Sequence, residues 1–130
     1  MARLIPIVAD KNLSKTRPVI ELTKWGKLLC YEKCSGRWFR SSQWKVEDAL
    51  AQLQGLYENL WEVNLNDLYS LLDIQETSRG AIYGWNAREC GEHFMLFETE
   101  LIERGFMTMD EPVLVLTPAV PAEKDYKDHF

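Results

Sequence analysis

The sequence is poor in the residues that build disulfide frameworks and in long apolar runs. It holds three cysteines among 130 residues, and this odd number suits a reducing cytoplasm better than a set of disulfides. The apolar run at residues 4–9 is interrupted by Pro6 and stops at Asp10, so it is too short for a secretory signal. Residues 113–120 fall far short of the roughly 18 residues of a membrane helix. We therefore expect a soluble, cytoplasmic protein.

Groups for catalysis are also scarce. Two histidines, His93 and His129, are the only imidazole bases, and there is no glycine-rich phosphate loop or G-x-S-x-G turn. Alternating glutamates after residue 97 could act as an acid–base pair, but such alternation is typical of the solvent-exposed face of a half-buried strand. We expect no enzyme and no cofactor. The lower-ranked alternative is a hydrolase or metal site around Cys90, Glu92 and His93.

One combination of residues has the composition of a zinc site. Cys30 and Cys34 are spaced C-x3-C, and Cys90 and His93 are spaced C-x2-H, so four ligands of a Cys3His site are present. Paired C-x2-C knuckles would indicate zinc, whereas this mixed spacing is typical of a buried strand cysteine and a turn cysteine. We expect no metal.

Charge is distributed unevenly along the chain. Hydrophobic residues make up 46% and charged residues 27%, as in ordinary globular domains, and the net charge is −5. Residues 1–45 carry ten basic and three acidic residues, whereas residues 46–130 carry five basic and seventeen acidic residues. Such asymmetry indicates a charged partner for one of the two parts.

Periodicity predicts the secondary structure. Residues 28–31 and 37–39 are β-prone runs around a Gly-containing turn, which predicts a hairpin. Apolar residues at spacings of three and four predict a helix over residues 46–61, and Asn64 is a natural cap for a second helix over residues 65–72. Residues 75–86 are expected to form a loop. Residues 94–101 and 113–116 predict an antiparallel strand pair.

These elements predict an α+β domain. A small antiparallel sheet, made of the N-terminal hairpin and the C-terminal strand pair, would pack on one long and one short helix. We expect this single domain to span residues 1–118. Residues 119–130 have too little apolar content to bury and are expected to form an extended, mobile tail.

Two surfaces are candidates for binding. The acidic part offers Glu98, Glu100, Glu103, Asp110 and Glu111, which would attract a basic protein surface, including one that holds nucleic acid.

The alternative is the basic, aromatic-rich hairpin. Basic groups beside aromatic platforms on a β surface are typical of single-stranded nucleic-acid binders. Its candidate residues are Lys33, Arg37, Trp38 and Arg40. The chain as a whole is negatively charged, so nucleic-acid phosphates would repel it. This repulsion favours the acidic surface over the hairpin as the binding surface.

Several stretches together carry a family resemblance. They are YEKCSGRWF at residues 31–39, the helix at 46–61, VNLNDLYSLLDI at 63–74, ETSRG at 76–80 and GW at 84–85. This succession resembles small uncharacterised proteins of bacteriophages and integrative elements of Gram-positive bacteria, over roughly residues 28–86. The chain departs from their pattern at Asp73, where the family tends to have glycine, and the three cysteines are not part of the pattern.

The resemblance implies a genomic setting rather than a mechanism. Small phage-encoded proteins often bind and disable a host defence component, such as a CRISPR effector. The leading hypothesis is thus a non-enzymatic accessory protein in the cytoplasm of a bacterial host. It would bind a host or phage protein, such as a nucleic-acid-handling enzyme, through the acidic surface.

Overall fold

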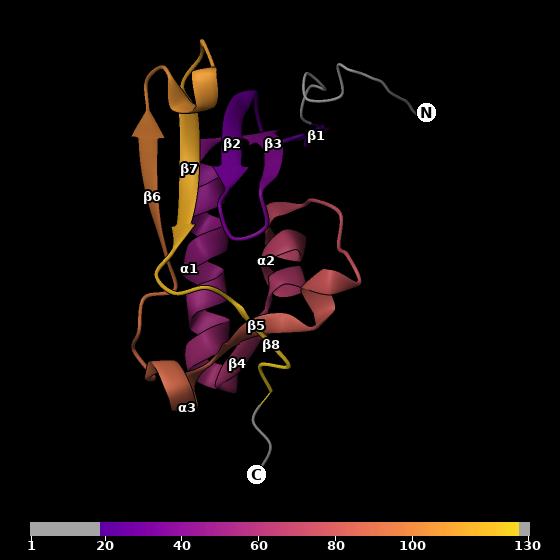
Figure 1. Cartoon of the computed structure of the whole chain (residues 1–130), viewed down its shortest axis with the longest axis vertical. Helices are drawn as coiled ribbons and strands as arrows, with labels where there is room; N and C mark the ends of the chain where they lie inside the picture. The colour runs from indigo at the N-terminus through magenta and orange to yellow at the C-terminus, as the bar shows by residue number, and fades with distance from the viewer. Residues whose placement is uncertain (1–18, 128–130) are drawn as a thin grey trace.

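A computed structural model describes residues 19–127 as an α+β fold with two sheets (Figure 1). The larger sheet has five strands in the order β1-β3-β2-β7-β6, and the smaller has three in the order β4-β5-β8. The strands are β1 (Ile20–Leu22), β2 (Leu28–Glu32), β3 (Arg37–Ser41), β4 (Glu62–Asn64), β5 (Tyr83–Asn86), β6 (Phe97–Ile102), β7 (Val113–Pro118) and β8 (Glu123–Lys124). The helices are α1 (Gln43–Leu60), α2 (Leu65–Leu72), α3 (Ala87–Cys90) and the 3-10 turns η2 (Arg79–Ala81) and η3 (Phe106–Thr108).

The predicted hairpin and strand pair both form, but the sheet that joins them is mixed. β2 pairs antiparallel with β3, and β6 pairs antiparallel with β7. β1 runs parallel to β3, and β7 runs parallel to β2. The expectation of a purely antiparallel sheet is therefore wrong. Alternating apolar residues specify a strand and its two faces, but they do not specify which distant strand becomes its neighbour.

The long helix α1 is confirmed and lies against one face of the larger sheet (Figure 1). Ser42 caps it by accepting a hydrogen bond from the Lys45 backbone N–H. Its buried stripe consists of Val46, Ala49, Leu53 and Tyr57, which follow the spacings of three and four in the sequence.

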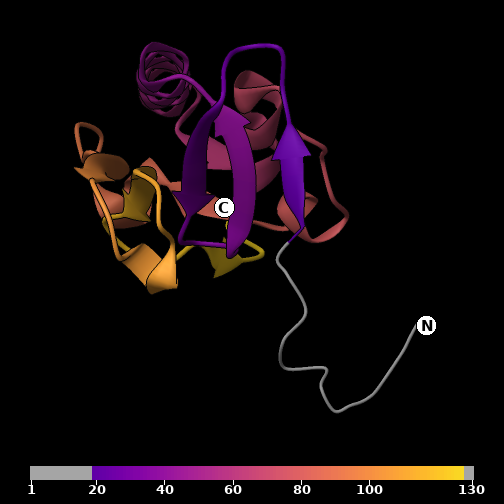
Figure 2. The same ribbon diagram turned by 90° about the horizontal axis from the view of Figure 1, so that it is seen from above.

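The short helix α2 begins and ends where its sequence predicts. Asn64 and Asp67 form a capping box, in which each side chain accepts a hydrogen bond from the backbone N–H of the other residue. The helix ends at Asp73, whose φ of 65° lies in the left-handed region. Seen from above, α1 and α2 lie on the same side of strands β1 to β3 (Figure 2).

The smaller sheet corrects two expectations. The segment expected to be a loop, residues 75–86, contains η2 and β5, and the segment expected to be a mobile tail contains β8. Tyr126 in that tail is buried, and its carbonyl oxygen accepts a hydrogen bond from the Asn86 side chain at 2.7 Å. The buried Tyr126 ring and the antiparallel pairing of β8 with β5 hold this segment in place, although its composition is mostly polar.

The two faces of the larger sheet are covered differently. Towards the helices, Cys30, Phe39, Leu114 and Leu116 enter the main core. On the opposite face Leu29, Val113 and Val115 form a smaller apolar cluster, over which the rings of Tyr31, Trp38 and Phe106 pack. Within residues 19–127, none of the helices combines the length and the apolar character that crossing a membrane requires.

Candidate functional site

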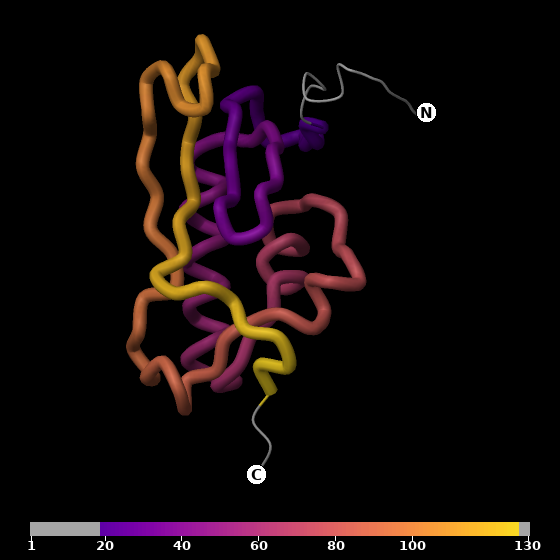
Figure 3. The backbone as a smooth tube through the Cα atoms, in the orientation of Figure 1, coloured from indigo at the N-terminus to yellow at the C-terminus, as the bar shows by residue number. Residues whose placement is uncertain are grey.

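A cleft of about 540 Å³ lies between the β2–β3 turn, α2, η2, β5 and the chain that leaves β7. Figure 3 shows that chain passing beneath the turn on its way to β8, the strand that pairs with β5. The residues that line the cleft are Lys33, Cys34, Ser35, Arg37, Leu65, Tyr69, Thr77, Arg79, Tyr83, Thr117, Pro118, Pro121 and Ala122. Three are cationic and none is a carboxylate, although the chain has 20 acidic residues. We call this region the cationic cleft.

Arg37 is held by two polar partners, Glu21 and Gln75, and by a tyrosine ring. One of its Nη atoms donates to the Gln75 carbonyl oxygen at 2.7 Å, and the other forms an ion pair with Glu21 at 2.8 Å. The guanidinium carbon also lies 4.4 Å from the centre of the Tyr69 ring. Arg37 therefore ties β3 to β1 and to the segment after α2, and these contacts fix its position beside the cleft.

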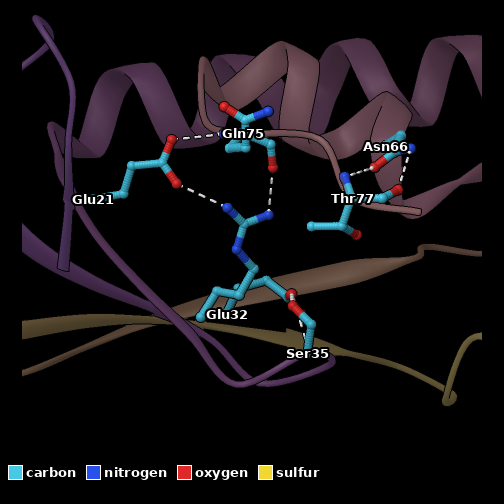
Figure 4. Close-up of polar contacts among 7 residues, drawn as sticks. Glu21, Glu32, Ser35, Asn66, Gln75 and Thr77 are labelled. Atoms are coloured by element: carbon cyan, nitrogen blue, oxygen red, sulfur yellow. Dashed lines mark hydrogen bonds and ion pairs between the residues drawn. The ribbon is translucent and has the colours of Figure 1, made fainter. Parts of the chain in front are cut away.

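Arg79 lies over a second tyrosine ring. Its guanidinium carbon is 4.4 Å from the centre of the Tyr83 ring. The turn that carries Arg79 is held by Asn66, whose side chain accepts from the Thr77 N–H at 2.9 Å and donates to the Thr77 carbonyl at 2.8 Å (Figure 4). A Cβ at Gly80 would lie 2.2 Å from the Asn66 Oδ1 atom, so the close approach of these segments requires glycine there.

A buried carboxylate holds the β2–β3 turn. Glu32 is 0% exposed, and it accepts hydrogen bonds from the backbone N–H groups of Cys34 at 2.5 Å and Ser35 at 3.1 Å, and from the Ser35 hydroxyl. Burial raises the pKa of Glu32, and these hydrogen bonds oppose the rise. Because the turn is held from beneath, Lys33 and Cys34 keep fixed positions at the cleft.

The other titratable groups of the cleft are also shifted by burial. Burial raises the pKa of Cys34, so the thiol form is favoured over the thiolate. Burial likewise raises the pKa of Tyr69, and hydrogen bonding with Ser35 opposes that rise. The cleft thus offers fixed positive charges, hydroxyl groups and aromatic faces, which are the elements of a binding site for an anion.

The acidic residues predicted to bind a partner lie on the β6–β7 hairpin. Glu98 and Glu100 are exposed on β6, opposite Thr117 and Val115 of β7, and both point away from α1. Glu103 and Asp110 are exposed in the segment that connects the two strands. The fifth residue, Glu111, forms an ion pair with Arg40 at 2.8 Å, so its charge is already balanced.

β6 is an edge strand with an apolar groove beside it. No strand among residues 19–127 pairs with its outer edge. The groove, of about 340 Å³, lies between α1 and β6 and is lined by Glu47, Leu50, Ala51, Gln54, Met95, Leu96, Phe97 and Thr99. Met95 is 60% exposed at this groove. We call β6 with its exposed Glu98 and Glu100 the acidic edge.

The residues of the nucleic-acid alternative do not form one surface. Arg37 and Trp38 are neighbours on β3 and point to opposite faces of the sheet: Arg37 packs on Tyr69, whereas Trp38 packs on Tyr31 with ring centres 4.6 Å apart. Arg40 is paired with Glu111. Lys33 lies at the cationic cleft.

The structure does not bring the four possible zinc ligands together. In the part of the chain that the structure describes, no group of three or more His, Cys, Asp or Glu residues could hold a metal ion. Cys30 is buried in β2, and its thiol donates to the Leu28 carbonyl. His93 is 81% exposed, with its Nε2 atom 3.5 Å from Glu92. His129 lies outside the described residues.

Sequence reasoning did not predict the cationic cleft. Tyr69, Arg79 and Tyr83 were not candidates, because Tyr69 was part of a predicted helix and the other two fell in a predicted loop. The Arg37–Tyr69 and Arg79–Tyr83 stacks join residues 32 and four positions apart, and neither spacing is a recognised motif. The glycines at 80 and 84 were the one available signal, since they mark close approaches of the backbone.

By its fold, the protein belongs to the α+β class, with a mixed five-stranded sheet and a second, smaller sheet. The chain belongs to a family of unknown function, DUF6353, whose model matches residues 7–127. Neither the curated proteins nor the solved structures include a match to it.

Proposed function

We propose that this protein is a non-enzymatic binding protein that takes up a basic, extended segment of a partner protein along the acidic edge. The observation that carries the proposal is the coincidence of three features at β6. These are an edge without a strand neighbour in the described chain, two exposed glutamates on one side of it and an apolar groove on the other.

A strand added to this edge would continue the hydrogen bonding of the sheet. Alternate side chains of the added strand would point to opposite faces. On one face they would meet Glu98 and Glu100, and on the other they would lie over the groove near Leu50 and Met95. The partner segment should therefore alternate basic and apolar residues.

Charge at this edge favours such a segment. Glu98 and Glu100 form no ion pair among residues 19–127 and are free to attract a basic strand. Electrostatic attraction of this kind mainly increases the association rate and the specificity. It also weakens with salt, because both glutamates are exposed to solvent.

The test uses a fluorescent peptide of alternating lysine and valine residues, titrated with the full chain at low salt. We expect Glu98→Lys with Glu100→Lys to weaken binding more than about tenfold, because two attractions become repulsions. The matched control, Glu76→Lys with Glu92→Lys, changes the net charge equally at exposed positions outside β6. A peptide with alternate backbone amides methylated should also fail to bind.

Two outcomes would reject the proposal. Equal weakening in the two double variants would show a response to net charge alone. Undiminished binding of the methylated peptide would show that the edge does not pair as a strand.

The biological setting of the partner follows from the resemblance to mobile-element proteins. We propose that the protein acts in the cytoplasm of a bacterial host on a nucleic-acid-handling defence enzyme, whose basic surface would supply the segment. Affinity capture at low salt from a defence-competent bacterial extract tests this. We expect such an enzyme with the natural chain as bait and not with the Glu98→Lys, Glu100→Lys variant.

A further inference from the structure

The cationic cleft shares no residue with the acidic edge, and the proposed function leaves it unused. Neither Lys33 nor Arg79 has an ion pair with a carboxylate among residues 19–127, and no carboxylate lines the cleft. In a chain with a net charge of −5, a cavity lined by three cations is a local reversal of the overall charge. Arg37 is paired with Glu21, but Lys33 and Arg79 add two positive charges to the same cavity, and a bound anion would balance them.

We infer that this cleft binds a small anion that carries both a phosphate group and a planar ring, as a mononucleotide does. Lys33, Arg37 and Arg79 supply the positive charge, and the hydroxyl group of Thr77, which accepts from the Gly80 N–H, supplies a further hydrogen-bond donor. Arginine is suited to phosphate because its planar guanidinium presents several N–H donors in one plane.

The position of Arg37 supports this role. Glu21 and the Gln75 carbonyl, both labelled in Figure 4, bind its Nη atoms. The Tyr69 ring supports one face of the guanidinium. An arginine held in this way loses little side-chain entropy when a ligand binds, which favours affinity.

The second requirement, a surface for a ring, is met by other residues of the cleft. The guanidinium carbon of Arg79 lies 4.4 Å from the centre of the Tyr83 ring, and Pro118 and Pro121 add apolar walls. Arginine planes and tyrosine rings are the platforms on which bases stack in nucleotide-binding proteins. A volume of about 540 Å³ is also within the range of sites for small molecules.

The experiment is a calorimetric titration of the full chain with the four common nucleoside 5′-monophosphates. Inorganic phosphate and the matching nucleosides are separate arms. At least one nucleotide should bind about tenfold or more tightly than phosphate or the nucleoside alone, since the phosphate group and the nucleoside each supply part of the contacts. Equal affinity for phosphate would overturn the ring as part of the ligand, and no binding in any arm would overturn the site.

Variants locate the binding. We expect Arg79→Gln and Lys33→Gln each to weaken nucleotide binding about tenfold, the usual effect of losing a charge-assisted hydrogen bond. Arg104→Gln removes an exposed cation outside the cleft and should leave affinity unchanged. Equal losses in all three variants would overturn the assignment, because they would show only a response to net charge.

A second measurement does not depend on the folding of any variant. Cys34 lines the cleft, whereas Cys90 lies at the end of α3. Saturating nucleotide should slow alkylation of Cys34 in the natural chain, measured by peptide mass spectrometry, and leave Cys90 unaffected. If Cys34 reacts at the same rate with and without nucleotide, the ligand does not occupy the cleft. Arg79→Gln should retain lysine–valine peptide binding, so failure of this inference is distinguishable from failure of the proposed function.

Discussion

The acidic edge and the cationic cleft use charge in opposite ways. At the acidic edge, Glu98 and Glu100 are exposed, and nothing among the described residues pairs with them. In the cationic cleft, Arg37 and Arg79 are held by tyrosine rings, and Arg37 is held by hydrogen bonds as well. Exposed, mobile charges suit attraction of a large partner, whereas fixed charges in a cavity suit selection of a small one.

The comparison also changes the meaning of the charge asymmetry along the sequence. Within residues 19–45, two of the arginines of the basic part are already paired, Arg37 with Glu21 and Arg40 with Glu111 from the acidic part. Lys33 instead joins Arg79, a cation from the acidic part, in the cleft. Folding mixes the two parts, so a regional charge balance predicts individual partners poorly.

The largest effect is expected from a substitution in the smaller sheet, which carries part of the cationic cleft and none of the acidic edge. A Cβ at Gly84 would lie 2.1 Å from the Val63 carbonyl oxygen, which forces β4 and β5 apart. Gly84→Ala should lower the free energy of unfolding by about 3 kcal/mol. It should also abolish nucleotide binding, because β5 carries Tyr83 of the cleft. Urea unfolding measures the stability.

The matched control is Gly55→Ala in α1, where nothing lies within 4 Å of the added Cβ. It should raise stability by about 0.5–1 kcal/mol, since alanine favours the helix more than glycine. If Gly84→Ala proved as stable as the natural chain, β5 would not be packed against β4 as described.

The second effect compares the two arginine ion pairs. Arg37→Met should cost about 1–2 kcal/mol, because it removes a charged hydrogen-bond donor that joins three segments and leaves Glu21 with only the Gln75 N–H as a partner. Arg40→Met should cost less than about 1 kcal/mol, because the Glu111 carboxylate of its pair is 46% exposed. Urea unfolding of both variants at one salt concentration measures the difference. Equal losses in the free energy of unfolding would show that the contacts of Arg37 stabilise the fold no more than the exposed Arg40–Glu111 pair does.

The smallest effect concerns pH and the turn beneath the cleft. Burial raises the pKa of Glu32, so the folded chain holds this proton at a pH where the unfolded chain has released it. Between the two pKa values the free energy of unfolding therefore falls as pH rises. Glu32→Gln should show a shallower fall above about pH 4.3, the ordinary pKa of a glutamate. Urea unfolding across pH 4–7 measures the slope.

The control for this slope is Glu103→Gln, which removes an exposed carboxyl outside the turn. That variant should keep the slope of the natural chain. Identical slopes in the natural chain and Glu32→Gln would show that Glu32 does not titrate differently in the folded state.

Much of the fold was predictable because its rules are local. The stripe of Val46, Ala49 and Leu53 identified α1, and Asn64 identified the first residue of α2. The hairpin and the strand pair were predicted from β-prone runs around turns. β5 and β8 were not, because both are short, and β5 contains Gly84, which ordinarily weakens a strand.

The acidic edge could be predicted from the sequence in part, whereas the cationic cleft could not. The alternation of Glu98 and Glu100 already placed both side chains on one face of a strand. Periodicity and capping, which act between near neighbours, were enough to predict α1, α2, the two antiparallel strand pairs and the exposed face of β6. The edge position of β6 and the shared cleft of Lys33, Arg37 and Arg79 were settled by tertiary structure alone. Those facts depend on contacts between segments far apart in the chain, which no local pattern specifies.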